Sequence, residues 1–434
     1  MAGSGTQSAP LTPDGFRVLE ARSGTLRLLP EPAAETAVLG YGGEVPGPLL
    51  RFAKGETVKL RLLNRLTQPT AIHWQGVRLQ NAMDGVVGLT QPEVPPGGSF
   101  DYVFTPPDSG TFLYRSCVPV HSAEQQGRGL HGVLIVDETL PPRIDREIIA
   151  ILQDWRLDQH GQIAAGFGAI ADASHAGRTG ALVTLGGRSL PEIVTLSPGA
   201  RVRLRLVNAC VARLALVSFE GFRPLVAAID GQPCDVFEPV RRTIPMGPGA
   251  RFDVMFDTES GPGAVILRGD GDPDRILVSL RPEGPARAAW PALASMPSNP
   301  LLPPVIKLQD SKKLDLVIEA QAKPDAAHIW KINGISASGT TGKPLFSVRA
   351  GSAVTLGLVN RSAFTHAIHV HGHHMRLLHD LDDGWEPYWR DSVLIEAGRT
   401  HHVAFVADNP GKWLIECLVL EHAASGLAGW FEVL

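Results

Sequence analysis

The sequence is poor in cysteine, carries no strong excess of either charge and contains no long apolar run. Four cysteines in 434 residues are too few for a disulfide scaffold. The formal net charge of −4 lacks the basic excess of a nucleic-acid-binding surface. No apolar stretch approaches the roughly 18 residues of a membrane-spanning helix. We therefore expect neither a nucleic-acid partner nor a membrane span.

The chain also lacks the pattern of a secretory signal at its start. Its first residues, Met-Ala-Gly-Ser-Gly-Thr-Gln, are small and polar, and no basic segment precedes an apolar run. No signal peptide is therefore expected in this chain.

Two of the four cysteines leave an alternative open. Cys210 and Cys234 both lie in the middle third of the chain, so they either form a disulfide or remain two buried free thiols. Buried free cysteines commonly behave as small apolar residues. The sequence does not decide between the two.

Glycine and proline, in contrast, are plentiful. The 46 glycines and 35 prolines lie between short strand-like runs, and long amphipathic helices are scarce. This pattern is typical of antiparallel β-sandwiches with Greek-key connections. With 44% hydrophobic residues the chain can bury sizeable cores, and its length fits about three domains. We therefore predict an all-β protein.

A strand-like segment recurs three times along the chain. Val58–Asn64, Val202–Asn208 and Val354–Asn360 alternate apolar and polar residues along most of their length, and each follows a glycine turn. Such alternation predicts a strand with one buried face. A second recurring segment lies further along each copy, at residues 97–104, 249–256 and 398–405. We infer three copies of one sandwich unit.

The repeats divide the chain into three domains. We predict domain 1 at residues 1–142, domain 2 at residues 143–284 and domain 3 at residues 309–434. The intervening residues 285–308 include a Pro/Ala-rich stretch with the composition of a linker.

The segment with the clearest chemistry lies near the end of the chain. Cys417 and His422 are five residues apart, and Leu427 follows five residues later. A soft thiolate and an imidazole from one loop, joined by a second His from an earlier strand, are the donors of a blue-copper site. The residues on either side of the cysteine are Glu416 and Leu418.

The repeats also align four pairs of side chains with one another. Each pair holds the outer residues of a strand triplet, so both side chains point to one face. Domains 1 and 3 each supply two pairs, and domains that face each other through them would enclose a shared pocket. The pairs are His73 and Gln75, Arg115 and Cys117, His369 and His371, and Glu416 and Leu418.

These segments resemble those of the three-domain multicopper oxidases, the laccases and their bacterial relatives. The resemblance covers nearly the whole chain and rests on ordered motifs in domains 1 and 3. The motifs are Ala71–Gly76, Met83–Gly85, Pro95–Gly98, Gly110–Tyr114, Gln125–Leu130, His366–His373 and the segment around Cys417. The resemblance implies three cupredoxin-like Greek-key sandwich domains, of which domain 2 carries no metal site.

In this family the last domain holds a type 1 copper. The resemblance places its ligands at His366, Cys417 and His422, with Leu427 at the axial position, where it cannot ligate. The axial residue tunes the potential of such a site, and we expect a higher potential than in a Met-ligated site. Electrons are expected to enter singly through an exposed edge of His422.

The family also holds a trinuclear copper cluster between its first and last domains, bound by eight histidines at the four aligned pairs. Here five of the eight positions carry other residues. Reduction of dioxygen to water takes four electrons delivered through this cluster, so laccase-type oxygen reduction is not expected. The replaced positions are Gln75, Arg115, Cys117, Glu416 and Leu418.

Three histidines remain at the trinuclear positions. His73 and His369 match the two type 2 ligands, and His371 is the histidine left at a type 3 position. With Glu416 or Cys117 nearby, they either hold a mononuclear copper or zinc or line a pocket without metal.

Further residues have expected roles around this pocket. Asp84 resembles the acid that hydrogen-bonds towards the type 2 site in the family. Arg115 and Glu416 occupy facing positions, and we expect them to form a buried ion pair in place of the lost metals. Burying such a pair costs desolvation.

Different classes of function remain open. One is a redox protein with about one copper, of type 1, that exchanges single electrons with a small molecule or a redox protein. Another is a copper-free scaffold or interaction protein on the same fold, and a third is an atypical active oxidase. Whether the chain is an enzyme stays undecided, as does its oligomeric state. The resemblance implies a periplasmic or secreted location.

Overall fold

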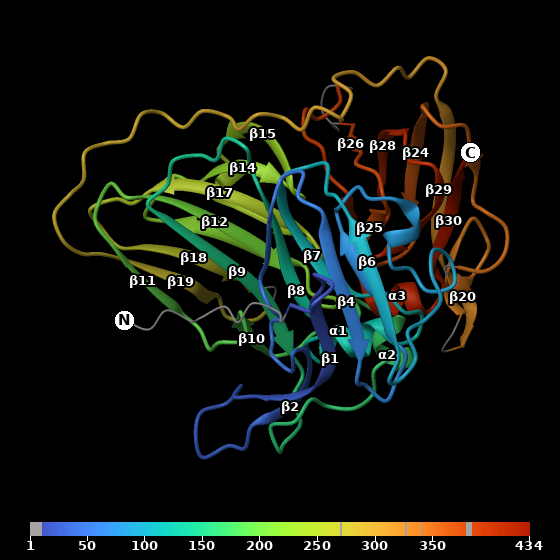
Figure 1. Cartoon of the computed structure of the whole chain (residues 1–434), viewed down its shortest axis with the longest axis horizontal. Coiled ribbons are helices and arrows are strands. Elements are labelled where there is room, and N and C mark those ends of the chain that lie inside the picture. The colour runs from blue at the N-terminus through green and yellow to red at the C-terminus, as the bar shows by residue number, and fades with distance from the viewer. Residues whose placement is uncertain (1–10, 270, 326–327, 339, 379–383) are drawn as a thin grey trace.

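The computed structural model describes residues 11–269, 271–325, 328–338, 340–378 and 384–434. Residues 1–10, where no signal peptide is expected, lie outside the described residues. The described part is almost entirely β-structure, in sheets that group as two for each repeat (Figure 1). This confirms the predicted all-β class.

The first repeat forms a sandwich of two four-stranded sheets, in the orders β2-β1-β4-β6 and β3-β8-β7-β5. A short helix, α1 (Ser122–Gly127), and a 3-10 turn, η1 (Asn81–Met83), lie in its connections. The strands are β1 (Arg17–Leu26), β2 (Thr36–Tyr41), β3 (Leu50–Ala53), β4 (Val58–Asn64), β5 (Ile72–Gln75), β6 (Ser99–Phe104), β7 (Gly110–Ser116) and β8 (His131–Asp137).

The second repeat pairs a six-stranded sheet, β10-β9-β12-β17-β14-β15, with a five-stranded sheet, β11-β19-β18-β13-β16. Helix α2 (Ile170–Ala173) and the turn η2 (Val240–Arg242) belong to its loops. Its strands are β9 (Arg146–Trp155), β10 (Leu182–Leu185), β11 (Glu192–Leu196), β12 (Arg201–Asn208), β13 (Ala215–Glu220), β14 (Leu225–Ile229), β15 (Gln232–Phe237), β16 (Thr243–Met246), β17 (Arg251–Asp257), β18 (Gly263–Arg268) and β19 (Arg275–Pro282).

The third repeat has one sheet in the order β21-β20-β24-β28-β26 and another in the order β22-β30-β29-β25-β27, whose strand β30 also pairs with β23. Its helix α3 (Leu420–Ala424) follows β29. The strands are β20 (Lys312–Asp325), β21 (His328–Ile332), β22 (Ala337–Ser338), β23 (Ser347–Val348), β24 (Ser352–Asn360), β25 (His366–Val370), β26 (Arg376–Leu377), β27 (Ser392–Ile395), β28 (Thr400–Ala407), β29 (Gly411–Cys417) and β30 (Leu427–Val433).

The recurring sequence segment occupies the same place in all three sandwiches. Strands β4, β12 and β24 each pair in parallel with the first long strand of their unit and antiparallel with the second recurring strand. The asparagine that ends each copy is buried, and its side-chain amide donates to a main-chain carbonyl of the following loop, for example from Asn64 to Gln68 at 2.8 Å and from Asn360 to Phe364 at 2.7 Å. Because buried polar groups need partners, this residue fixes the loops around each strand end.

A cluster of buried apolar residues fills each sandwich, and the cluster of the third also includes Ala123, Ala173, Val211 and Ala212 from the other two units. All four cysteines are free and buried, so the disulfide alternative for Cys210 and Cys234 is wrong and the free-thiol alternative is confirmed. No described helix is long and apolar enough to cross a membrane. The predicted boundaries at residues 142, 284 and 308 fall between the sandwiches and remain a prediction.

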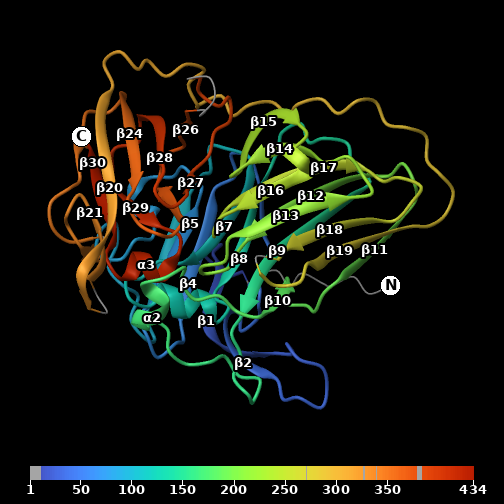
Figure 2. The same cartoon turned by 180° about the vertical axis from the view of Figure 1, so that it is seen from behind.

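The three sandwiches pack against one another, and their loops meet around the sites that matter for function. In Figure 1 the blue strands of the first unit lie between the green strands of the second and the red strands of the third. From behind, helix α2 of the second unit lies beside helix α3 of the third (Figure 2). Strands β5 and β7 thus face the third unit, whose strands β25 and β29 carry the aligned histidine and cysteine segments.

Candidate metal centres

Three predicted donors converge in the third sandwich. His366 begins β25, Cys417 ends β29, and His422 lies on α3, five residues after Cys417. The Cys417 Sγ lies 3.8 Å from the Nδ1 of each histidine, and the two Nδ1 atoms are 3.1 Å apart. All three side chains are fully buried. One soft sulfur and two imidazole nitrogens around a single point are a donor set that suits copper.

The far nitrogens of both rings have their own partners, which fixes the proton positions. His422 Nε2 donates to the carbonyl of His175 at 2.7 Å. His366 Nε2 lies 2.9 Å from the hydroxyl of Ser362, which itself donates to Asn360 Oδ1 at 2.8 Å and therefore accepts from the imidazole. With both Nε2 atoms protonated, both Nδ1 lone pairs point at the sulfur. Outer partners of this kind orient metal-binding histidines.

Burial sets the charge of the three donors. It raises the pKa of Cys417 to about 12 and lowers the pKa of His422 to about 4, and it lowers the pKa of His366 well below its ordinary range. The histidines are thus neutral and ready to ligate. The thiol must lose its proton when a metal binds, because cysteine ligates metals as the thiolate.

An indole packs against both histidines of this site. Trp330 lies on β21 and is fully buried, with ring centroids 4.8 Å from His366 and 4.7 Å from His422. Its Nε1 donates to the carbonyl of Ala173 at 2.7 Å. Leu427, at the start of β30, is also fully buried and belongs to the same core cluster as Cys417. The site is therefore shielded from bulk solvent by apolar side chains, which control solvent access and the local dielectric at a metal site.

The expected exposed edge of His422 is wrong. Its ring is 0% exposed, and its Nε2 is capped by the carbonyl of His175 from the second domain. No sequence signal predicts this contact, because the two residues are 247 positions apart and the acceptor is a main-chain atom.

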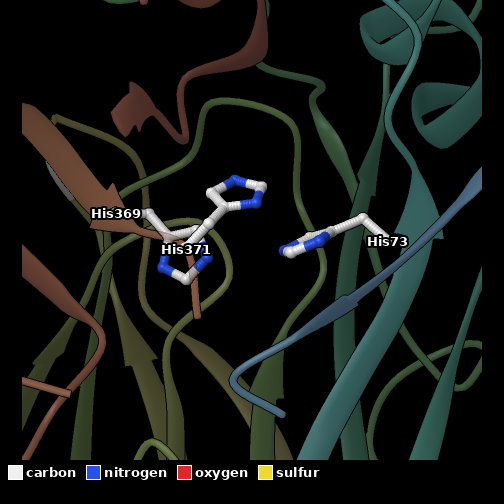
Figure 3. A group of neighbouring side chains, drawn as sticks. All are labelled: His73, His369 and His371. Carbon is white, nitrogen blue, oxygen red and sulfur yellow. The ribbon is translucent and has the colours of Figure 1, made fainter. Parts of the chain in front are cut away.

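The second group of histidines lies between domains 1 and 3. Figure 3 shows His73 projecting from the domain 1 side towards His369 and His371 on the opposite side. His73 Nδ1 donates to the carbonyl of Asp84 at 2.9 Å, and His369 Nδ1 donates to the carbonyl of Asp391 at 2.8 Å. The Nε2 atoms of both rings are buried and have no hydrogen-bond partner among the described residues. With His371, these two residues form a buried cluster whose possible ligand atoms lie within 4.8 Å of one another, so the two free imidazole lone pairs fit a metal ion.

His371 differs from these two, because both of its nitrogens meet carboxylates. Its Nδ1 lies 2.9 Å from Asp84 Oδ2 and its Nε2 lies 3.2 Å from Glu416 Oε1. Burial lowers the pKa of His371, but Asp84 and then Glu416 more than offset it and raise the pKa to about 9. The ring stacks on His73 with centroids 4.0 Å apart. In this arrangement His371 is a cation between two anions.

The predicted ion pair between domains 1 and 3 is present. Arg115 Nη2 contacts Glu416 Oε1, and the two side chains are 1% and 7% exposed. Burial would raise the pKa of Glu416, but Arg115 and then His371 lower it well below its usual range. Arg115 Nε also donates to Gln75 Oε1 at 2.9 Å. Cys117 and Leu418, the other two positions where the resemblance leads one to expect histidine, are buried.

A second buried ion pair, between domain 2 and domain 3, was missed by sequence reasoning. Arg251 and Asp391 form a two-point ion pair, and both side chains are essentially unexposed. Asp391 also accepts with its carbonyl from His369, and Arg251 Nη1 donates to Gly249 O at 2.9 Å, which in turn accepts from Gln75 at 3.2 Å. Domain 2 thus contacts both Asp391 of domain 3 and Gln75 of domain 1. An isolated Arg in a strand carries no sequence signal for this role.

Family models described as multicopper oxidase match residues 25–140 and residues 309–434. The solved structure of a multi-copper oxidase from Pseudomonas thermotolerans is 30% identical to this chain, covering 96% of it and 98% of that protein, with a TM-score of 0.85. The chain belongs to the multicopper oxidase family.

Other relatives agree with this assignment. The structure of Lac15 from a marine microbial metagenome is 32% identical and covers 96% of this chain and 99% of that protein, with a TM-score of 0.78. The multicopper oxidase MmcO of Mycobacterium tuberculosis is 28% identical over 96% of this chain and 88% of that protein. Membership of the multicopper oxidase family carries a copper cofactor and a redox role at the level of the family, and it agrees with the cupredoxin-like fold.

Proposed function

We propose that this multicopper oxidase relative binds one type 1 copper and exchanges single electrons. The observation that carries the proposal is the convergence of Cys417 Sγ with the Nδ1 atoms of His366 and His422, whose Nε2 atoms are both occupied. Copper held there supplies a one-electron redox couple. The protein's own residues hold the two imidazoles in the ligating tautomer, and the surrounding apolar side chains exclude water.

The trinuclear oxygen-reducing centre is, in our proposal, lost. A guanidinium from Arg115 stands where a cupric ion would need a neutral imidazole, and a fixed cation repels further cations in a buried pocket. Glu416 and Leu418 flank Cys417 and provide no imidazole for an onward electron path. The contacts of Gln75 with Arg115 fill another of these positions with a hydrogen bond between protein groups.

A mononuclear metal can still occupy the remaining pocket. His73 and His369 offer free Nε2 atoms, and Asp84 and Glu416 supply nearby negative charge. This donor set suits copper or zinc. In the proposal His371 stays with its carboxylates, and His73 and His369 would hold the ion.

Copper analysis of purified, copper-loaded protein, combined with its visible spectrum, tests the proposal. We expect one or two coppers for each chain and an intense blue absorption, which a Cys-ligated cupric ion produces. The main alternative is a copper-free scaffold, which predicts no bound copper. The Arg115–Glu416 pair favours this alternative, because it joins domains 1 and 3 without metal. Four coppers with oxygen consumption would instead identify an atypical active oxidase.

The partner follows from this chemistry only as a class. We propose a small molecule or a redox protein that gives or takes one electron, and a periplasmic or secreted location, as the family resemblance implies. Copper analysis does not depend on either point.

A further inference from the structure

A segment of domain 2 covers the type 1 site. Residues 164–178, here called the cover segment, include α2 and lie against α3 (Figure 2). Three hydrogen bonds tie the segment to domain 3: Trp330 Nε1 donates to Ala173 O at 2.7 Å, His422 Nε2 to His175 O at 2.7 Å, and the amide of Gly168 to Glu421 Oε1 at 3.4 Å. Two of these bonds come from side chains that form or contact the copper-ligating set.

The other side of the cover segment faces solvent. His175 is exposed although its carbonyl is bonded to the buried ring of His422. Its own ring packs on Phe364, with centroids 5.5 Å apart. The neighbouring Ala171, Ala176 and Ala363 are exposed and small, so a partner can approach this point closely. One residue thus spans the distance from a copper ligand to the surface.

We propose that electrons reach and leave the type 1 copper through the hydrogen bond from His422 Nε2 to the carbonyl of His175, with exchange at the surface around His175 and Ala176. This inference rests on the proposed function, because it needs a copper at Cys417. His175 acts as a positioning residue: its carbonyl fixes the ring of His422 and its exposed side marks the exchange point. A main-chain carbonyl serves this role whatever side chain the residue carries.

The covered ring restricts the class of donor. A molecule that must hydrogen-bond directly to a copper-ligating imidazole finds His422 Nε2 already occupied and the ring 0% exposed. A donor or acceptor that passes one electron without direct contact with that ring, such as a redox protein or a soluble metal complex, needs only to approach the cover segment. Hexacyanoferrate(II) is a suitable probe because it is anionic and reacts by losing one electron.

Charge variants at Ala176 test the route. The copper-loaded, oxidised protein is mixed with hexacyanoferrate(II), and loss of the blue absorption is followed as the cupric ion takes one electron and hexacyanoferrate(III) forms. We expect Ala176→Glu to slow and Ala176→Lys to speed the second-order reaction, each about threefold at an ionic strength of roughly 0.1 M. At about 1 M salt, where charges are strongly screened, all rates should approach that of the wild type.

Ala350 supplies the matched control. It is exposed, and its amide donates to the carbonyl of Leu434 at 2.8 Å. Leu434 follows Val433, which pairs with Gly411 at the start of β29, whereas Cys417 is at the other end of that strand. Seven strand residues place it roughly 20 Å from the copper ligand. Ala350→Glu and Ala350→Lys should leave the rate nearly unchanged. Equal effects at Ala350 and Ala176, or no effect at Ala176, would overturn the proposed route while the blue spectrum still upholds the copper site.

A second readout needs no copper. Hydrogen exchange of the unloaded protein should show slow exchange in residues 164–178, since the described contacts hold the cover segment against α3. Exchange at the rate of an unstructured chain would show that the cover opens freely and would contradict a fixed route through His175. A wild-type protein that takes up no copper at Cys417 would overturn the proposed function itself, and this route with it.

Discussion

Arg115 of domain 1 and Glu416 of domain 3 meet as a buried ion pair, 301 residues apart in sequence. In the proposed function both occupy positions at which the multicopper oxidase family has metal-binding histidines. The pair joins the two domains across the pocket, and Gln75 and His371 extend it on either side. In the proposed function the two residues compensate each other, since a cation and an anion would replace two neutral ligands and the metal between them.

Removal of one partner of this pair should destabilise the fold. Arg115→Ala leaves Glu416 buried without its main counter-ion, which typically costs about 3–5 kcal/mol in the free energy of unfolding. Urea denaturation of the wild type and the variant measures the difference. The matched control is Arg268→Ala, which removes a partly exposed arginine paired with Glu220 and Asp274 and should cost no more than about 1 kcal/mol. Equal stability of wild type and Arg115→Ala would contradict the structural role of the pair.

The type 1 site should depend on its thiolate. Cys417→Ser replaces the soft sulfur donor by a hydroxyl, so the blue absorption should disappear and copper bound at this site should fall to near zero. Metal analysis and the visible spectrum measure both. Cys210→Ser is the control, because Cys210 is another buried free thiol but lies in domain 2. A blue band that survives in Cys417→Ser would place the copper elsewhere.

Oxygen consumption should be absent or far below that of an intact oxidase. With a phenolic or cuprous donor, an oxygen electrode should record no sustained uptake by the copper-loaded protein. In the proposed function Arg115, Glu416 and Leu418 leave no place for a paired oxygen-binding site. The related enzyme from Pseudomonas thermotolerans, assayed in parallel, shows that the conditions are suitable. Stoichiometric four-electron turnover by this protein would contradict the proposed loss of the cluster.

Buried histidines should make the protein less stable in acid. Burial lowers the pKa of His131 from an ordinary value of 6.5 to about 4, although a hydrogen bond with Gln153 raises it. In the unfolded chain His131 is therefore protonated as the pH falls below 6.5, whereas in the folded chain it stays neutral until the pH approaches about 4. The stability that His131 contributes is fully present above pH 6.5 and is lost as the pH falls to about 4, by up to roughly 3 kcal/mol.

His131→Gln isolates this contribution. Glutamine keeps an N–H donor for Gln153 Oε1, which lies 2.7 Å from His131 Nε2, but does not titrate. Unfolding by urea at pH 7 and at pH 4.5 should show a smaller loss for the variant than for the wild type. His160→Gln, at an exposed position, should follow the wild type. Parallel losses in all three proteins would show that His131 is protonated in the fold.

Much of the fold and of the sites could be predicted because equal spacing from a repeated segment matches residues of one domain with residues of another. The recurring Val-to-Asn segments identified the central strands β4, β12 and β24. Counting from their ends placed His73 beside His369, and counting from Gly110 and Gly411 placed Arg115 opposite Glu416. Strand periodicity makes such counting exact, since residues two apart share a face.

The contacts that sequence could not supply are those between loops of different domains. The cap on His422 is a main-chain carbonyl, which every residue has, and it comes from a loop of domain 2 that no motif marks. Likewise Arg251 and Asp391 are ordinary strand and loop residues until the packing of the domains brings them together. Local patterns fix where a side chain points along its own strand, but domain packing decides what covers it.

The measurement that tests the central claim most directly is the copper content of each chain, taken together with the visible spectrum of the same copper-loaded sample. An isolated type 1 site, with or without a mononuclear metal between domains 1 and 3, predicts one or two coppers for each chain and an intense blue absorption. Four coppers for each chain, or bound copper without any blue absorption, would contradict it.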